Sequence, residues 1–248
     1  MITSMLRVTM VMTGLLIAAG VSGAEADPGK ALTSPSRPQA DRDRDADRKP
    51  AELMRFFGVH PGMTALDLIA GGGYMTEVLS IAVGPKGKVY SQNPPAMLEP
   101  GGRYLAQVEA RFAGGRLPNV VRVDEDLPAS NLIAPGSVDF AITAMNLHDL
   151  YNRDPAKALA FMKAVFTTLK PGGVFGVIDH VGKPGADNAK LHRMPKQAAL
   201  DLAGEAGFTV EAESNLLAHP QDDHTQMVFA PGLRGKTDQF VLKLHKPR

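Results

Sequence analysis

Two pairs of neighbouring histidine and aspartate residues are best suited to acid–base chemistry. One pair is His148-Asp149 and the other is Asp179-His180. A carboxylate beside an imidazole can orient the ring as a general base, so His148, Asp149 and His180 are candidate catalytic residues. The pattern also permits a structural interpretation, in which Asp149 caps a helix and Asp179-His180 satisfies the amides of a loop.

A glycine-rich turn is the second feature that could carry chemistry. The run Asp67-Leu68-Ile69-Ala70-Gly71-Gly72-Gly73-Tyr74 follows a short apolar segment and leads into a helical pattern. Glycines let the backbone turn tightly and approach a ligand at the N-terminus of the next helix. The turn therefore predicts a ligand site, whose N–H groups suit an anionic group such as a carboxylate.

Two common nucleotide-binding motifs do not fit the chain. Thr76 stands where a dinucleotide-binding fingerprint has its third glycine, and Asn93 replaces the acid of that fingerprint. Ala230 stands where a phosphate-binding loop ending in Gly235-Lys236-Thr237 would have its first glycine. A nicotinamide-dependent oxidoreductase and a nucleotide hydrolase are therefore disfavoured.

The elements that must position these residues alternate between strand and helix from residue 64 to about residue 208. Apolar runs predict strands, and apolar residues at helical spacing predict helices. The alternation predicts βαβ units in a doubly wound, mostly parallel α/β fold. The expected strands are 64–69, 88–93, 119–123, 137–145, 174–179, 208–215 and 240–246, and the expected helices are 51–57, 74–83, 103–115, 154–169 and 195–208.

The N-terminal region is expected to lie outside that fold. Residues 1–24 combine one positive charge at Arg7, an apolar core and small residues at a cleavage position, which is typical of a secretory signal peptide. Residues 25–50 are rich in turn formers and alternating Asp and Arg, which indicates a linker or surface arm. The charged run could form a solvated helical turn, or the arm could fold over the mouth of an active site. Residues 51–248 remain as the single domain.

Composition narrows the partners without naming a function. Lys and Arg number 27 against 26 Asp and Glu, so the net charge is +1, and removal of Arg7 with the signal peptide leaves zero. Binding of nucleic acid through bulk charge is therefore not expected. The chain has no Cys, which excludes disulfides and thiolate metal sites. His192-Arg193 and Asp222-Asp223-His224 can line a pocket for a substrate. No fixed metal-ligand spacing links them, so no metal site is predicted.

The sequence resembles the class I S-adenosylmethionine-dependent methyltransferases over nearly all of residues 51–248. Asp67, Gly71 and Gly73 match their acid-x-Gly-x-Gly-x-Gly motif, and Ile69 departs at the first glycine. Further motifs follow in the family's order: Val138-Asp139-Phe140, Asn146-Leu147-His148-Asp149, Leu169-Lys170-Pro171-Gly172-Gly173 and Ala206-Gly207-Phe208. Segments such as 44–52, 71–77, 146–150 and 234–240 also resemble a group of exported, largely uncharacterised predicted methyltransferases.

The resemblance implies a Rossmann-like sheet with an antiparallel last strand, and S-adenosylmethionine as the cofactor. Asn93 would stand in for the acid that usually holds the ribose, and either Asp124 or Asp126 would meet the adenine. Asn146 would position the cofactor or the acceptor. The implied cofactor-binding residues are Asp67, Ile69, Ala70, Gly71, Gly72, Gly73, Tyr74, Asn93, Asp124, Asp126 and Asn146.

Two functions are compatible with these features. The first is an exported, periplasmic methyltransferase that acts on a small-molecule acceptor, with no nucleic-acid partner and no membrane span once the signal peptide is cleaved. The second is a non-catalytic exported ligand-binding protein that retains the fold. The departures at Ile69 and Asn93 motivate the second, as does the cytosolic origin of the cofactor. The sequence does not indicate the acceptor or the oligomeric state.

Overall fold

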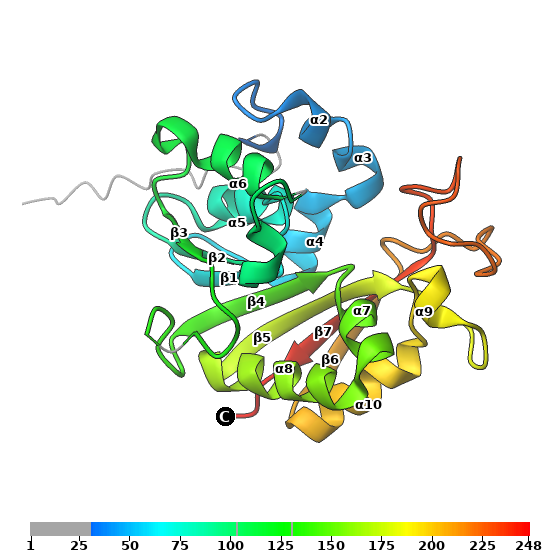
Figure 1. Cartoon of the computed structure of the whole chain (residues 1–248). Helices are drawn as coiled ribbons and strands as arrows, with labels where there is room; N and C mark the ends of the chain where they lie inside the picture. Colours follow the sequence, from blue (N-terminus) through cyan, green and yellow to red (C-terminus); the bar gives the residue numbers. More distant parts are fainter. Residues whose placement is uncertain (1–30, 103, 130) are drawn as a thin grey trace, which may run out of the picture.

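A computed structural model describes residues 31–102, 104–129 and 131–248 (Figure 1). The predicted signal peptide and the first residues of the predicted arm lie outside these ranges. Among the described residues, none of the helices combines the length and the apolar character that a membrane crossing requires.

One seven-stranded sheet forms the centre of the domain, in the order β3-β2-β1-β4-β5-β7-β6. Neighbouring strands are parallel except at β7, which runs antiparallel to both β5 and β6. The predicted doubly wound sheet with an antiparallel last strand is therefore confirmed. The strands are β1 (Thr64–Leu68), β2 (Lys88–Gln92), β3 (Val120–Val123), β4 (Val138–Ala144), β5 (Leu169–His180), β6 (Thr209–Ser214) and β7 (Gln239–His245).

Helices cover both faces of the sheet (Figure 1). One face carries α4, α5 and α6, and the other carries α7, α8 and α10. The α-helices of the described residues are α2 (Gln39–Arg42), α3 (Asp45–Arg48), α4 (Pro50–Phe57), α5 (Tyr74–Val83), α6 (Leu105–Phe112), α7 (Leu147–Arg153), α8 (Pro155–Thr168), α9 (Asn188–Leu191) and α10 (Lys196–Ala206). Short 3-10 turns are η1 (Pro95–Leu98) and η2 (Ala113–Gly115).

The alternation of side chains along each strand divides the core into two layers. On β1, Leu66 and Leu68 pack in the layer beneath α8 and α10, whereas Ala65 packs in the layer beneath α4 and α5. Asp67 lies between Leu66 and Leu68 in the sequence, so its side chain points to the α5 face. A buried carboxylate there needs a donor, and Thr76 of α5 supplies one.

Helix α7 was not predicted, and β5 is longer than expected. α7 has only seven residues and is followed within two residues by α8, so no long apolar period signals it. β5 was expected to begin at Val174 because Pro171-Gly172-Gly173 indicates a turn. Instead Leu169 already pairs with Val138, and the pairing shifts register before Val174 meets Phe140.

The described part of the predicted arm packs onto the domain. Arg37 is buried, and its guanidinium binds Asp45 at 2.5 and 3.1 Å and donates to the carbonyl of Leu32 at 2.7 Å. The hydroxyl of Tyr74, the first residue of α5, also donates to Asp45 at 2.7 Å. These charged side chains are therefore not simply a solvated face, since they attach α3 to the start of α5.

A second ionic cluster centres on Glu77 of α5, whose side chain is only 3% exposed. Arg116 lies 2.5 Å from its carboxylate, and Arg111 forms a second ion pair with it. Arg111 also donates to the carbonyl of Gly72 at 2.6 Å and lies 2.7 Å from Asp41 of α2. One guanidinium thus links α6, the glycine turn and the arm.

The Glu77→Gln variant is expected to unfold more easily than the wild type by about 3 kcal/mol, because it leaves two arginines beside a neutral group in a buried site. Urea denaturation followed by circular dichroism measures the difference. The matched control is Glu213→Gln, which breaks the exposed Lys196–Glu213 ion pair and should cost only about 0.2–1 kcal/mol. Equal losses in the two variants would contradict a central role for the Glu77 cluster.

Candidate active site

A cleft of about 830 Å³ opens at the carboxyl ends of β1, β4 and β5. Its volume is in the usual range for small-molecule sites, and β1 and β4 flank the point where the strand order reverses. Nine of the predicted site residues line it: Ile69, Ala70, Gly71, Gly72, Tyr74, Asn146, His148, Asp149 and His180. The structure therefore brings most of the glycine turn and the candidate catalytic residues to one cleft.

Ile69 adopts an unusual backbone conformation at the position where the resemblance expects glycine. Its φ is 52°, in the left-handed region that a β-branched residue rarely enters. Such strain costs of the order of 1–3 kcal/mol and persists only where the surroundings enforce it. Here Gln92 accepts from the Ile69 N–H at 3.1 Å, and Asn146 donates to the Ile69 carbonyl at 3.2 Å. Gln92 at the end of β2 and Asn146 just after β4 thus hold the glycine turn in shape.

Asn93 supports the turn instead of lining the cleft. Its side chain is buried, accepts from the Gly71 N–H at 2.8 Å and donates to the Gly71 carbonyl at 3.2 Å. These two bonds resemble the pairing of a neighbouring strand, so they fix the backbone of Gly71. The Asn93 amide faces the turn in this structure. Its expected contact with a ribose stays a prediction.

The three carboxylates expected near the cofactor lie away from the cleft surface. Asp67 is buried and accepts from the Thr76 hydroxyl at 2.6 Å, and burial raises its pKa to about 7. Asp124 and Asp126 are exposed after β3, and Asp124 pairs with Arg122 at 2.6 Å. None of the three is among the residues that line the cleft.

The end of the cleft that holds His148 is organised by Asp179, whose side chain is fully buried at the end of β5. Its carboxylate accepts from the backbone N–H of His148 at 2.8 Å and of His180 at 2.7 Å. It also lies 2.7 Å from Nδ1 of the His148 ring. Asp179 therefore orients His148, whereas the sequence suggested the adjacent Asp149 for that role.

The two buried histidines of this end have opposite electrostatic environments. Burial alone would lower the pKa of His148, but the charge and hydrogen bond of Asp179, with the charge of Asp149, raise it. Burial lowers the pKa of His180 to about 4, and the nearby His148 and Arg193 act in the same direction against Asp179. His180 is thus neutral at pH 7, and its Nδ1 lies 2.8 Å from the hydroxyl of Thr237.

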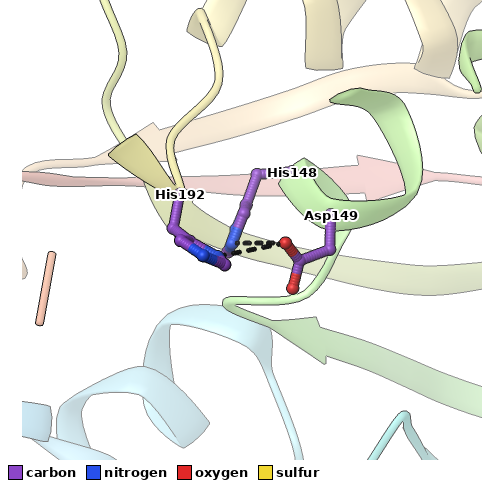
Figure 2. Close-up of side chains that lie close together, drawn as sticks. All are labelled: His148, Asp149 and His192. Atoms are coloured by element: carbon purple, nitrogen blue, oxygen red, sulfur yellow. Dashed lines mark ion pairs between the residues drawn. The ribbon is translucent and has the colours of Figure 1, made fainter. Parts of the chain in front are cut away.

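His192 joins His148 and Asp149 in a cluster of three side chains (Figure 2). Oδ1 of Asp149 lies 3.4 Å from Nε2 of His148 and 3.2 Å from Nδ1 of His192. His148 and Asp149 come from α7, while His192 comes from the end of α9 with a φ of 54°. The sequence alone does not single out His192 among the candidate polar residues. Only folding brings α9 next to α7.

Side chains from α6, from the arm and from the loop before β7 also line the cleft, and the sequence patterns do not predict most of them. A Cβ on Gly71 would lie 3.1 Å from the ring of Tyr104, and one on Gly72 would lie 2.3 Å from Oε1 of Gln107. Any side chain at these two positions would press against Tyr104 or Gln107, so the glycines let these residues pack closely on the turn. Nothing in the local pattern of α6 signals this contact.

The arm contributes cations to the same cleft. Arg44 and Arg48 line it and lie 4.8 and 4.7 Å from the centre of the Tyr74 ring, a distance at which cation–π attraction operates. The alternating charges of the arm were the available signal for this arrangement.

Other polar candidates build structure outside the cleft. Arg193 and Asp222 form a fully buried ion pair at 2.8 and 3.1 Å. His224 lies 3.0 Å from Asp238. Asp222 and His224 therefore hold the loop that leads to β7. Arg234 and Gly235 of the same loop line the cleft.

Comparisons with known proteins give one related sequence and many related structures. No protein-family model matches the chain. An uncharacterized methyltransferase of Synechocystis sp. is 30% identical over 124 residues. The match covers 50% of this chain and 50% of the relative, so the chain spans about half the length of the curated relative it matches.

Two solved structures illustrate the structural likeness. A SAM-dependent methyltransferase from Aquifex aeolicus has a TM-score of 0.59 at 21% identity, covering 88% of this chain and 98% of that chain. The 1,6-didemethyltoxoflavin-N1-methyltransferase of Burkholderia thailandensis, with bound 1,6-didemethyltoxoflavin and S-adenosylhomocysteine, has a TM-score of 0.55 at 20% identity. That match covers 85% of this chain and 82% of that chain. The chain has the class I methyltransferase fold.

Replacing Asp67 by Asn is expected to change the pH dependence of stability. The folded pKa of about 7 lies above the usual Asp pKa of 3.8, so folding disfavours the ionised form. The wild type should therefore lose stability relative to Asp67→Asn as the pH rises from about 4 to about 7, at ~1.4 kcal/mol per pH unit. Denaturant titrations of both proteins at pH 4.5, 5.5, 6.5 and 8 measure the difference. Parallel curves across this range would show that Asp67 is not protonated by burial.

Proposed function

We propose that the chain is an S-adenosylmethionine-dependent methyltransferase that acts on a small-molecule acceptor. The observation that carries the proposal is the single cleft with the glycine turn at one end and the His148 cluster at the other, in a class I methyltransferase fold. A cofactor seated on the turn and an acceptor beside the histidines would meet within that cleft. The small-molecule class is supported by the Burkholderia enzyme, which holds a small heterocycle and the demethylated cofactor.

The residues present fit the cofactor at the methionine end. Gly71 and Gly72 present backbone without side chains, which lets a ligand approach the start of α5. Arg44 and Arg48 line the same region and would attract a carboxylate. When bound, S-adenosylmethionine supplies an electrophilic methyl group on a sulfonium.

The ribose end of the cofactor would be held differently from the usual pattern. The acid that the family places after the second strand is replaced by Asn93, whose amide faces Gly71. Tyr104, which precedes α6, and Gln107 of α6 line the cleft over the glycine turn, so they are the side chains positioned to contact the ribose and the base.

At the acceptor end, the protein's task is to align and to exclude water. Alignment of two reactants can contribute about 7–11 kcal/mol to a displacement, so a strong base is needed only for an acceptor that holds its proton tightly. His148, Asp149 and His180 line this end, and Asp179 fixes the orientation of the His148 ring. These three residues are proposed to contact the acceptor.

The alternative is a ligand-binding protein that keeps the fold without turnover. The strained Ile69 and the buried Asn93 favour it, because both depart from the usual cofactor turn. Release of S-adenosylhomocysteine in the presence of an acceptor panel distinguishes the two functions, since a binding protein releases none.

Isothermal titration calorimetry of the purified protein with S-adenosylmethionine and S-adenosylhomocysteine tests cofactor binding. Gly71→Asp should weaken binding by at least ~100-fold, because it places a charged side chain in the proposed cofactor turn, against the ring of Tyr104. Gly185→Asp is the matched control, because Gly185 also has a left-handed backbone, with a φ of 79°, and has open space around it. A folded wild type that binds neither compound would overturn the proposal.

We further propose that residues 1–24 direct export and are removed. Protein recovered from the periplasm of a Gram-negative host should then begin at Glu25 by intact mass. Leu15→Arg should block processing, because it places a charge in the apolar core of the signal, whereas Thr3→Arg adds the same charge to the positive region and should be processed. Full-length wild type in the periplasm would refute cleavage after Ala24.

A further inference from the structure

Three donor atoms converge at the acceptor end of the cleft in an arrangement that resembles a metal site. His148 Nε2, His192 Nδ1 and a carboxylate oxygen of Asp149 all lie within 4.8 Å of one another (Figure 2). An ion 2.0–2.1 Å from tetrahedral ligands holds them about 3.4 Å apart. The separations of 3.4 and 3.2 Å from Asp149 are close to that value. His192 is partly exposed, so its ring can turn to close the third side.

The two imidazole nitrogens lack other partners in the described part of the chain. His148 Nε2 and His192 Nδ1 are both buried atoms, and neither makes a hydrogen bond with any described residue. The His148 side chain is only 3% exposed. A buried polar atom without a partner costs about 1–3 kcal/mol. Both nitrogens point toward Asp149, so one bound cation would satisfy them together.

The surroundings of His148 match those of a metal-binding histidine. Such a ring usually donates its other N–H to a carboxylate, which fixes the tautomer that leaves the remaining nitrogen free for the metal. His148 has this contact, because its Nδ1 lies 2.7 Å from Asp179. Asp179 is in turn held by two backbone N–H groups, so the orientation of the ring is fixed.

Carboxylates and a paired guanidinium surround the cluster. The buried guanidinium of Arg193 is paired with Asp222 at 2.8 and 3.1 Å. Nδ1 of His180 lies 2.8 Å from the hydroxyl of Thr237, and Asp149 and Asp179 place two carboxylates beside the histidine rings. Carboxylates next to two unpartnered imidazole nitrogens favour an added cation.

We propose that His148, Asp149 and His192 bind one divalent transition-metal ion of the Zn²⁺ type. Two imidazoles and one carboxylate suit Zn²⁺, Co²⁺ or Fe²⁺, whereas Mg²⁺ and Ca²⁺ prefer oxygen ligands alone. A three-ligand site leaves a coordination position open, and two of its ligands line the cleft. The ligand class for that position is an oxygen donor, such as a hydroxyl or a phenolate of the acceptor. This last step rests on the proposed function, but metal binding does not.

The competing arrangement is a set of ion pairs without a metal, in which one or both imidazoles are protonated and pair with Asp149. This arrangement predicts no affinity for metals. It also leaves His148 Nε2 at 3.4 Å from the carboxylate, beyond the usual length of an N–H···O bond.

The test loads the purified, chelator-treated protein with Zn²⁺ or Co²⁺ without any cofactor. We expect about one ion per chain by mass spectrometry of the metal, and a Co²⁺ visible absorption spectrum typical of low coordination number. His192→Ala and Asp149→Asn should each weaken binding by at least 10-fold, and both change partly exposed side chains, so the fold should survive. His60→Ala, an exposed histidine outside the cleft, is the matched control and should bind like the wild type.

Three results would overturn the metal site. They are a wild type that binds no ion above the level of His192→Ala, variants that bind as tightly as the control, and a Co²⁺ spectrum that does not change between wild type and His192→Ala. Calorimetry with S-adenosylhomocysteine on the same metal-free samples reports on the proposed function separately. Failure of one proposal is therefore distinguishable from failure of the other.

Discussion

The end of the cleft that holds His148 depends on one buried carboxylate. Asp179 is fully buried at the end of β5, so it must find donors, and it finds them in the backbone of His148 and His180 and in the His148 ring. These bonds tie the start of α7 to β5. They fix both the position of α7 and the direction of His148, and α7 in turn carries Asp149 to the cleft. The same bonds therefore anchor α7 to the sheet and orient the His148 ring in the cleft.

The end of the cleft at the glycine turn depends on a comparable set of buried charges. Arg111 contacts Glu77, Asp41 and the Gly72 carbonyl, so a single side chain from α6 connects the arm to the glycine turn. Removing one member of such a cluster leaves its partners charged and buried, which is why these contacts act together. The glycine turn and the arm both line the cleft. Hydrogen bonds hold the strained turn, and ion pairs hold the arm.

Much of the fold could be predicted from local pattern. The apolar runs and the glycine and proline breaks located all seven strands, with ends that shifted by a few residues. The helix α7 escaped because seven residues carry too little periodicity. β5 was expected to be shorter because Pro171-Gly172-Gly173 signals a turn, yet its flanking residues pair with β4 across a shift in register. Local signals identify elements but do not weigh a turn against a strand pairing.

The sequence by itself determined the glycine turn, the order of the motifs, the position of His148 and Asp149 just after β4 and the position of His180 at the end of β5. These follow from residue types and spacing along the chain. Tertiary structure alone decided that Asp179 orients His148, that Asn93 faces Gly71, and that His192 meets Asp149. The reason is physical. A buried polar atom needs a hydrogen-bond partner, and only the folded chain decides which residues lie close enough to supply one. Here those residues come from elements that are far apart in the sequence.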